Sequence, residues 1–227
     1  MTHRAAPLST PIVTLIGLLP LLASCGDAPV APPPRTSSDV PAPSAPRYPT
    51  DDASWGRYHS KRFLLSFPLP DGKAWRIDDH SRPSLLALHE ATSSRVTVLA
   101  TQEDELVNRQ KCEARARELG WVTSKTLTTV EDEVTVGPEA YDSRIWVALD
   151  AAKPGGELEG HVYLFGAFIR RCLLVHLSTK VPSAKDVDVL SERLALARAR
   201  IVRGLTIDPP RTTDEATVPR DKADIRR

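Results

Sequence analysis

The chain has 227 residues, of which 41% are hydrophobic, 26% are charged and 5% are aromatic. Its 30 Lys and Arg residues balance 29 Asp and Glu residues, so the formal net charge is +1. A chain this close to neutral offers no extended basic surface to a nucleic-acid backbone, and we expect no nucleic-acid partner.

The first 24 residues have the pattern of a secretory signal peptide. Arg4 is followed by an apolar run over residues 11–22, and two small residues come directly before Cys25. The run is about half of the roughly 20 residues that a transmembrane helix needs. A signal peptide is therefore the favoured interpretation of this segment.

Leu22-Ala23-Ser24-Cys25 resembles the lipobox of bacterial lipoproteins, in which the cysteine thiol receives diacylglycerol before cleavage. We predict that residues 1–24 are removed and that acyl chains on Cys25 anchor the protein to a membrane. The alternative is an ordinary signal peptide with a coincidental cysteine. Gly26 stands where an Asp resembles the inner-membrane retention signal of enteric bacteria, which favours the outer membrane facing the periplasm. Asp27, one position later, leaves localisation in the inner membrane as an alternative.

Residues 25–50 form a predicted linker. Eight of the chain's twenty prolines lie between Asp27 and Thr50. Proline-rich segments favour extended polyproline II and bury too little surface to fold, so we expect a disordered, semi-rigid tether. Residues 51–208 are then one globular domain, long enough to bury a core. The charged segment 209–227 is predicted to be disordered.

Strands and two helices are predicted within this domain. Helical spacing and flanking capping signals predict helices over about 103–119, ending at Gly120, and 184–203, ending at Gly204. One face of the second helix is apolar, with residues stepping by three and four: Val187, Leu190, Leu194, Ala197 and Ile201. Alternating or β-branched stretches predict strands over 62–68, 74–77, 84–89, 95–100, 122–130, 133–136, 143–149, 161–168 and 172–179.

With Cys25 assigned to lipid, Cys112 and Cys172 remain as a pair of thiols. In an oxidising compartment such a pair favours one disulfide, which would fix the first helix to the sheet. Two separate buried thiols are the main alternative. A redox or metal pair is a third, although the spacing lacks a C-x-x-C motif.

The strand over 172–179 indicates the fold class. Period-two alternation places Cys172, Leu174 and His176 on one face and three apolar residues, Leu173, Val175 and Leu177, on the other. A strand that is apolar on both faces belongs in the middle of a covered sheet. We therefore expect an α/β/α sandwich with a central, mostly antiparallel sheet between two flanking helices.

The chain resembles the PsbP-like family, including bacterial envelope lipoproteins of the DcrB type, over residues 54–207. The resemblance rests on Phe63-Leu64-Leu65-Ser66-Phe67-Pro68, Trp75, Arg171-Cys172-Leu173-Leu174-Val175 and the final amphipathic helix. It implies an α/β/α sandwich and a non-enzymatic accessory, assembly or interaction module. No functional residue is carried over, because the fold serves proteins with different partners.

No motif in the sequence identifies an active site. A nucleophile elbow, a P-loop and a glycine-rich dinucleotide fingerprint are all missing from the sequence. His89-Glu90 begins like a zinc-protease helix, but the second histidine is missing and a turn is the favoured interpretation. Asp78-Asp79-His80 offers cation ligands, for which a solvated polar loop is favoured instead.

Two histidines are expected to approach each other across a hairpin. Glu157, Glu159 and His161 alternate along a strand, and His176 comes near His161 if the turn falls at residues 169–171. Facing histidines can hold zinc, but hydrogen-bonded or solvent-facing pairs are more common. We predict no catalytic residue, no metal site and no cofactor.

These features predict a lipid-anchored, non-enzymatic binding or accessory module of the bacterial cell envelope. Its expected partners are the membrane, through Cys25, and an envelope protein that the sequence does not identify. One alternative is a toxin-neutralising or secretion-associated lipoprotein. A weaker alternative is a metal-dependent hydrolase that uses Asp78, Asp79 and the histidines.

Overall fold

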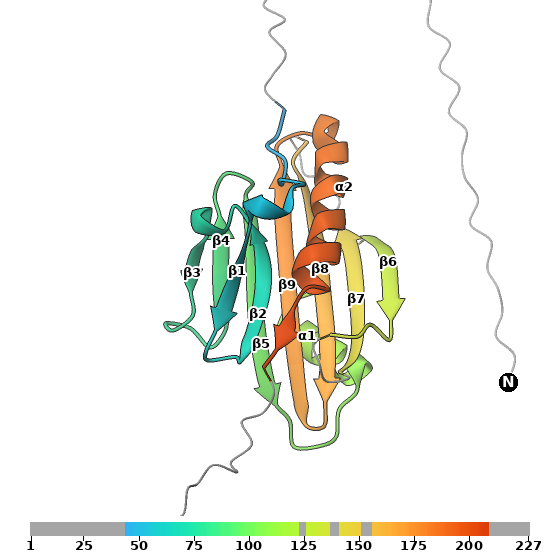
Figure 1. Cartoon of the computed structure of the whole chain (residues 1–227). Helices are drawn as coiled ribbons and strands as arrows, with labels where there is room; N and C mark the ends of the chain where they lie inside the picture. Colours follow the sequence, from blue (N-terminus) through green and yellow to red (C-terminus); the bar gives the residue numbers. More distant parts are fainter. Residues whose placement is uncertain (1–43, 123–125, 137–140, 151–155, 209–227) are drawn as a thin grey trace, which may run out of the picture. The chain divides into compact units, whose positions relative to one another are not determined.

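Figure 1 shows the chain as a computed structural model, which describes residues 44–122, 126–136, 141–150 and 156–208. The predicted signal peptide, Cys25, the linker up to residue 43 and the tail 209–227 lie outside these ranges and stay predictions. Among the helices of the described ranges, none is long and apolar enough to cross a membrane.

A seven-stranded antiparallel sheet forms the centre of the domain. Its strand order is β3-β4-β5-β9-β8-β7-β6. The strands span β3 Arg76–Asp78, β4 Leu85–His89, β5 Ser94–Gln102, β6 Thr126–Asp132, β7 Asp142–Leu149, β8 Leu158–Phe168 and β9 Arg171–Val181. The fourth position in the order belongs to β9, which confirms the prediction that this doubly apolar strand lies in the middle.

A second, three-stranded sheet has the order β1-β2-β10. It consists of β1 Trp55–Ser60, β2 Leu65–Pro70 and β10 Thr206–Ile207. Of these three strands the sequence predicts only β2. The residues of β1 are mostly half-buried or exposed and therefore give no clear apolar alternation, and β10 has only two residues. Residues 133–136 are not a strand, contrary to prediction, although Val134 and Val136 are buried.

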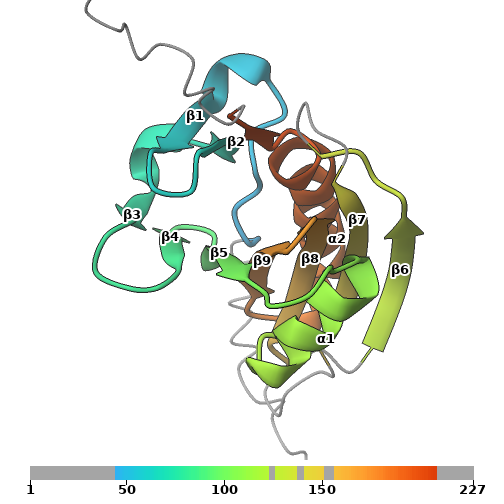
Figure 2. The same ribbon diagram turned by 90° about the horizontal axis from the view of Figure 1, so that it is seen from below.

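Two helices lie on opposite sides of the large sheet, as Figure 2 shows for α1 and α2 on either side of β8. The helix α1, Arg109–Glu118, begins later than predicted, with the Asn108 side chain accepting a hydrogen bond from Lys111 N at 2.9 Å. The residues before it form no helix. Instead, Glu103 N and Val107 N donate hydrogen bonds to backbone carbonyls of the β8–β9 turn. The helix α2, Val187–Leu196, follows a 3-10 turn, Ala184–Asp186, and continues as a π-helical segment, Ala197–Val202.

The central sheet therefore separates two hydrophobic clusters. The cluster under α1 contains Cys112, Ala116, Trp146, Phe165, Cys172 and Leu174. The cluster under α2 and the small sheet contains Phe67, Val162, Leu173, Val175, Leu177, Leu190 and Ile201. This division confirms the predicted α/β sandwich and the predicted faces of β9. On α2 itself the prediction is wrong for Val187, which is 41% exposed.

The folded domain starts earlier than the predicted residue 51. Ala45 and Tyr48 are buried, and the Tyr48 hydroxyl donates a hydrogen bond to Ser94 Oγ at 2.6 Å. Residues 44–50 therefore belong to the domain and not to the linker. The high proline content of this segment predicts a linker. Proline lacks a backbone N–H but keeps its carbonyl group, and the carbonyl of Pro46 accepts a hydrogen bond from the folded domain.

Arg193 is the largest fully buried side chain in the described structure, at 1% exposure. From α2 its guanidinium donates to Thr92 O at 2.8 Å, to Lys180 O at 2.8 Å and to Pro46 O at 3.0 Å. It also donates to the Thr179 hydroxyl at 3.1 Å. One side chain thus connects α2 with the N-terminal segment, the β4–β5 turn and the end of β9.

Replacing Arg193 by Met should lower the free energy of unfolding by about 3 kcal/mol. The variant keeps an apolar stem but leaves several buried carbonyl oxygens without this donor, at about 1–3 kcal/mol for an unsatisfied group. Urea unfolding followed by circular dichroism measures the difference. The control is Arg198→Met, which removes a partly exposed ion pair with Glu131 and should cost less than about 1 kcal/mol. Equal losses in the two variants would contradict the assignment.

Candidate functional site

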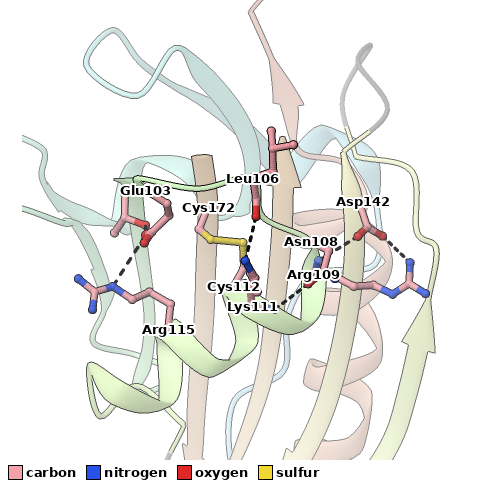
Figure 3. The surroundings of a disulfide bond; sticks show 10 residues. Glu103, Leu106, Asn108, Arg109, Lys111, Cys112, Arg115, Asp142 and Cys172 are labelled. Atoms are coloured by element: carbon pink, nitrogen blue, oxygen red, sulfur yellow. Dashed lines mark hydrogen bonds and ion pairs between the residues drawn. A yellow bond between two sulfur atoms is a disulfide. The ribbon is translucent and has the colours of Figure 1, made fainter. Parts of the chain in front are cut away.

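A disulfide joins Cys112 on α1 to Cys172 at the start of β9, across a sequence separation of 60. Both cysteines are buried, at 0% and 1% exposure. Figure 3 shows the bond between the helix and the sheet, as expected from the sequence. The disulfide is therefore a structural link between the α1 layer and the central strand.

Polar contacts fix α1 on both sides of this bond (Figure 3). Asp142 at the start of β7 accepts hydrogen bonds from the backbone N of Arg109, at 2.9 Å, and from its guanidinium. Partial burial raises the pKa of Asp142, but these hydrogen bonds and the nearby positive charge outweigh it, so the pKa is lowered. On the other side of the disulfide, Arg115 Nε lies 3.8 Å from Glu103 Oε1. The helix is thus held by charge as well as by the covalent link.

The β8–β9 hairpin brings His161 and His176 together, as the sequence predicts. His161 Nδ1 lies 3.0 Å from His176 Nε2, and the His161 residue is 2% exposed. The His176 ring stacks on Tyr163 with a centroid distance of 4.4 Å. Burial lowers the pKa of His161, and burial together with His161 lowers the pKa of His176 to about 3. Both rings are therefore neutral near pH 7.

Two carboxylates complete this cluster. Asp150, directly after β7, lies beside Glu159 on β8, and one ligand atom of each of these residues and of His161 lies within 4.8 Å of the others. Glu157 is outside the cluster and pairs with Lys180 at 3.6 Å. The alternation along the strand predicts Glu159 and His161 on one face but does not indicate Asp150. Its place directly after a predicted strand was the available signal.

The predicted loop Asp78-Asp79-His80 does not converge on a cation. Asp78 accepts hydrogen bonds from the backbone N of His80 and Ser81 and is part of a turn. Asp79 is buried and accepts hydrogen bonds from Tyr58 at 3.1 Å and Ser60 at 2.8 Å. Each carboxylate thus has its own protein partners and points to different neighbours.

His89 ends β4 and belongs to the core. Its ring stacks on Trp75 with centroids 5.2 Å apart, and Nδ1 lies 2.7 Å from Thr92 Oγ1. This geometry agrees with the predicted turn and not with a zinc-protease helix. Burial is the main cause that lowers the pKa of His89.

A serine, a histidine and a carboxylate meet on the small sheet, where sequence reasoning missed them because they come from three separate strands or strand ends. His59 Nδ1 lies 3.0 Å from Ser66 Oγ, and His59 Nε2 lies 3.8 Å from Asp208 Oδ2. The second distance is too long for a hydrogen bond, and the His59 and Asp208 side chains are 45% and 39% exposed. An activated nucleophile needs a base oriented by hydrogen bonding, so this set does not provide one.

An open cavity of about 620 Å³ lies beside β1 and the 3-10 turn Gly72–Ala74. Its walls include Trp55, Arg57, Tyr58, Leu69, Lys73 and Ile77. The volume is within the range of small-ligand sites, and the lining combines aromatic with charged groups. The cavity is not predictable from the sequence pattern, because β1, which forms one of its walls, was not predicted.

No family model and no curated protein sequence match the chain. Solved structures with a similar arrangement include the Ran-binding protein Mog1p of Saccharomyces cerevisiae, with 8% identity, a TM-score of 0.46, and coverage of 67% of this chain and 95% of that one. LpqN, involved in cell envelope biogenesis of Mycobacterium tuberculosis, has 14% identity, a TM-score of 0.38, and coverage of 72% and 99%. A Bacteroides thetaiotaomicron protein has 13% identity, a TM-score of 0.36, and coverage of 69% and 49%. No residue role is transferred from structures this distant.

The disulfide predicts a specific alkylation pattern in the purified chain. When the chain is alkylated in denaturant without reductant, peptide mapping should find Cys112 and Cys172 unlabelled, and after reduction both should carry the label. Removing the bond by Cys112→Ala with Cys172→Ala should cost up to about 4 kcal/mol of unfolding free energy in the chain-entropy model. Labelling of both residues in the denatured but unreduced protein would refute the bond.

His89 predicts a loss of stability on acidification. The unfolded chain binds the His89 proton near pH 6.5, whereas the native state binds it only at lower pH, since burial lowers the pKa. Its contribution is therefore complete above about pH 6.5 and decreases as the pH falls below that value. His89→Gln should lose less unfolding free energy between pH 7 and pH 5 than the wild type does. His80→Gln, at an exposed position, is the control and should keep the wild-type pH dependence.

Proposed function

We propose that the protein is exported, anchored by acyl chains on Cys25, and acts as a non-enzymatic binding or accessory module of the bacterial cell envelope. The observation that carries the proposal is the buried disulfide between Cys112 and Cys172. Disulfides of this kind persist in oxidising compartments and are rare in the cytosol. The lipobox-like sequence at Cys25 favours the same compartment on independent grounds.

The anchor and the tether follow from the sequence before the domain. Diacylglycerol and an amide-linked chain at Cys25 supply the two or more lipid groups that stable attachment requires. Because the domain begins by residue 44, the tether comprises residues 25–43. In polyproline II conformation these residues reach up to about 60 Å. We place the protein on the outer membrane, facing the periplasm.

Binding without catalysis is supported by the arrangement of the polar side chains. The surface set of Ser66, His59 and Asp208 lacks an oriented base, and Asp78 and Asp79 have separate protein partners. The hydrolase alternative thereby loses Asp78 and Asp79 as a converging pair of metal ligands. The cavity beside β1 is our proposed contact site for the envelope partner, since its Trp55 and Tyr58 are residue types enriched in protein interfaces.

The anchor is tested by detergent phase partitioning of the wild type and of Cys25→Ser in a bacterial host that processes lipoproteins. The wild type should be recovered from outer-membrane fractions in the detergent phase. The variant should be exported, should form the same disulfide and should appear in the aqueous phase. Equal partitioning of the two chains would contradict lipidation at Cys25.

The same membranes test the binding function with a photo-crosslinker introduced at Lys73, on the cavity wall. The matched control is a crosslinker at Lys111, on the α1 face, which contacts Glu105 at 3.0 Å. We expect a reproducible adduct with one envelope protein from position 73 and none from position 111. Absence of any adduct, with turnover of an envelope substrate by the purified chain, would overturn the proposal.

A further inference from the structure

The ends of β7 and β8 place two carboxylates directly opposite each other. Asp150 N donates a hydrogen bond to Glu159 O at 2.9 Å, so the two residues pair across the strands just beyond the regular ladder. Like charges at opposed positions of antiparallel strands destabilise the sheet unless a cation lies between them. Lys180 contacts Glu159 Oε2 at 3.4 Å, but Asp150 Oδ1 is buried and has no hydrogen bond within the described residues.

His161 points its second ring nitrogen toward this pair. Its Nε2 lies 3.5 Å from Asp150 Oδ2, is buried, and makes no hydrogen bond among the residues that the structure describes. A buried imidazole nitrogen without a hydrogen bond is unusual in proteins. This nitrogen lies in one cluster with the Asp150 and Glu159 carboxylates, and in the tautomer that carries the proton on Nδ1 its lone pair is available to a metal ion held by them.

We propose that Asp150, Glu159 and His161 bind a divalent first-row transition-metal ion, best matched by Zn²⁺. One imidazole and two carboxylates are common zinc ligands, and three protein ligands leave a position for water. Zinc–ligand bonds of about 2.1 Å place tetrahedral donors about 3.4 Å apart. The three groups lie within 4.8 Å, so rotation of the Asp150 and Glu159 side chains closes the remaining gap.

His176 supports this site as a positioning residue. When His161 coordinates through Nε2, its Nδ1 carries the proton and donates a hydrogen bond to His176 Nε2, which lies 3.0 Å away. Metal-bound histidines usually donate their other N–H in this way, which fixes the ring and the tautomer. His176 is itself held by its stacking on Tyr163. The hairpin thus supplies both a ligand and the group that orients it.

The imidazole distinguishes this site from one for calcium or magnesium. Those ions prefer oxygen ligands, whereas a neutral imidazole favours zinc and its neighbours in the first transition row. The site is also reachable by an ion from solvent, since the side chains of Asp150 and Glu159 are 23% and 16% exposed. Binding would join the end of β7 to β8.

Calorimetric titration tests the proposal on the full chain, purified in mild detergent and freed of metal with a chelator. ZnCl2 should bind with one-to-one stoichiometry and CaCl2 should bind much more weakly. Asp150→Asn, Glu159→Gln and His161→Gln should each weaken zinc binding by more than about 10-fold, and His176→Phe by about 10-fold. Glu157→Gln is the matched control, because Glu157 and Glu159 both contact Lys180 and only Glu159 belongs to the cluster.

Co²⁺ gives a second measurement that a purely structural effect does not produce. A visible absorption spectrum of a nitrogen–oxygen site should appear in the wild type and in Glu157→Gln, and should be lost in Glu159→Gln. Circular dichroism identifies any variant that fails to fold, and the two carboxylate variants keep the test valid if His161→Gln does not fold. No zinc binding by the wild type, or zinc binding that Asp150→Asn and Glu159→Gln leave unchanged, would overturn the proposal.

Discussion

The buried guanidinium of Arg193 is the interaction on which the arrangement of this domain most depends. A buried cation is costly unless hydrogen bonds satisfy it, and here the acceptors are neutral oxygens from distant parts of the chain. The carbonyl groups of Pro46, Thr92 and Lys180 must all be in place before the charge is satisfied. The position of α2, the start of the domain and the end of β9 are therefore set together.

The opposite face of the same sheet is fixed by different means. There Cys172 of β9 is bonded covalently to α1, and Asp142 of β7 holds the first turn of that helix through Arg109. The two constraints act at opposite ends of β9, since Lys180 lies near its last residue and Cys172 near its first. The central strand is thus tied to one layer at each end. His176 lies on this strand between the two constraints, so its position beside His161 is well fixed.

The sequence predicts the features that arise from a local residue pattern. It does not predict those that depend on contacts between residues far apart in the chain. The alternation of 172–179 correctly places β9 in the middle, and the hairpin turn correctly joins His161 to His176. The burial of Arg193 cannot be predicted from apolar periodicity, because its charge is satisfied by residues up to 147 positions away. Asp150 falls just after a strand, where a carboxylate normally indicates only a turn. Composition likewise assigned Tyr48 to a linker.

The early start of the domain also bears on where the proposed metal ligands lie relative to the point at which the chain enters the fold. Ala45 N lies 3.4 Å from Asp186 Oδ1, so the chain enters the fold next to the start of α2 and the end of β9. Antiparallel pairing puts Glu159 opposite Lys180, at this same end, while the β8–β9 turn lies at the other. The proposed metal ligands are therefore on the end of the domain where residues 44–50 enter it, and the exposed Ile169 is on the opposite end. The entering segment is held at this end through Pro46, because Pro46 O accepts a hydrogen bond from Arg193 of α2.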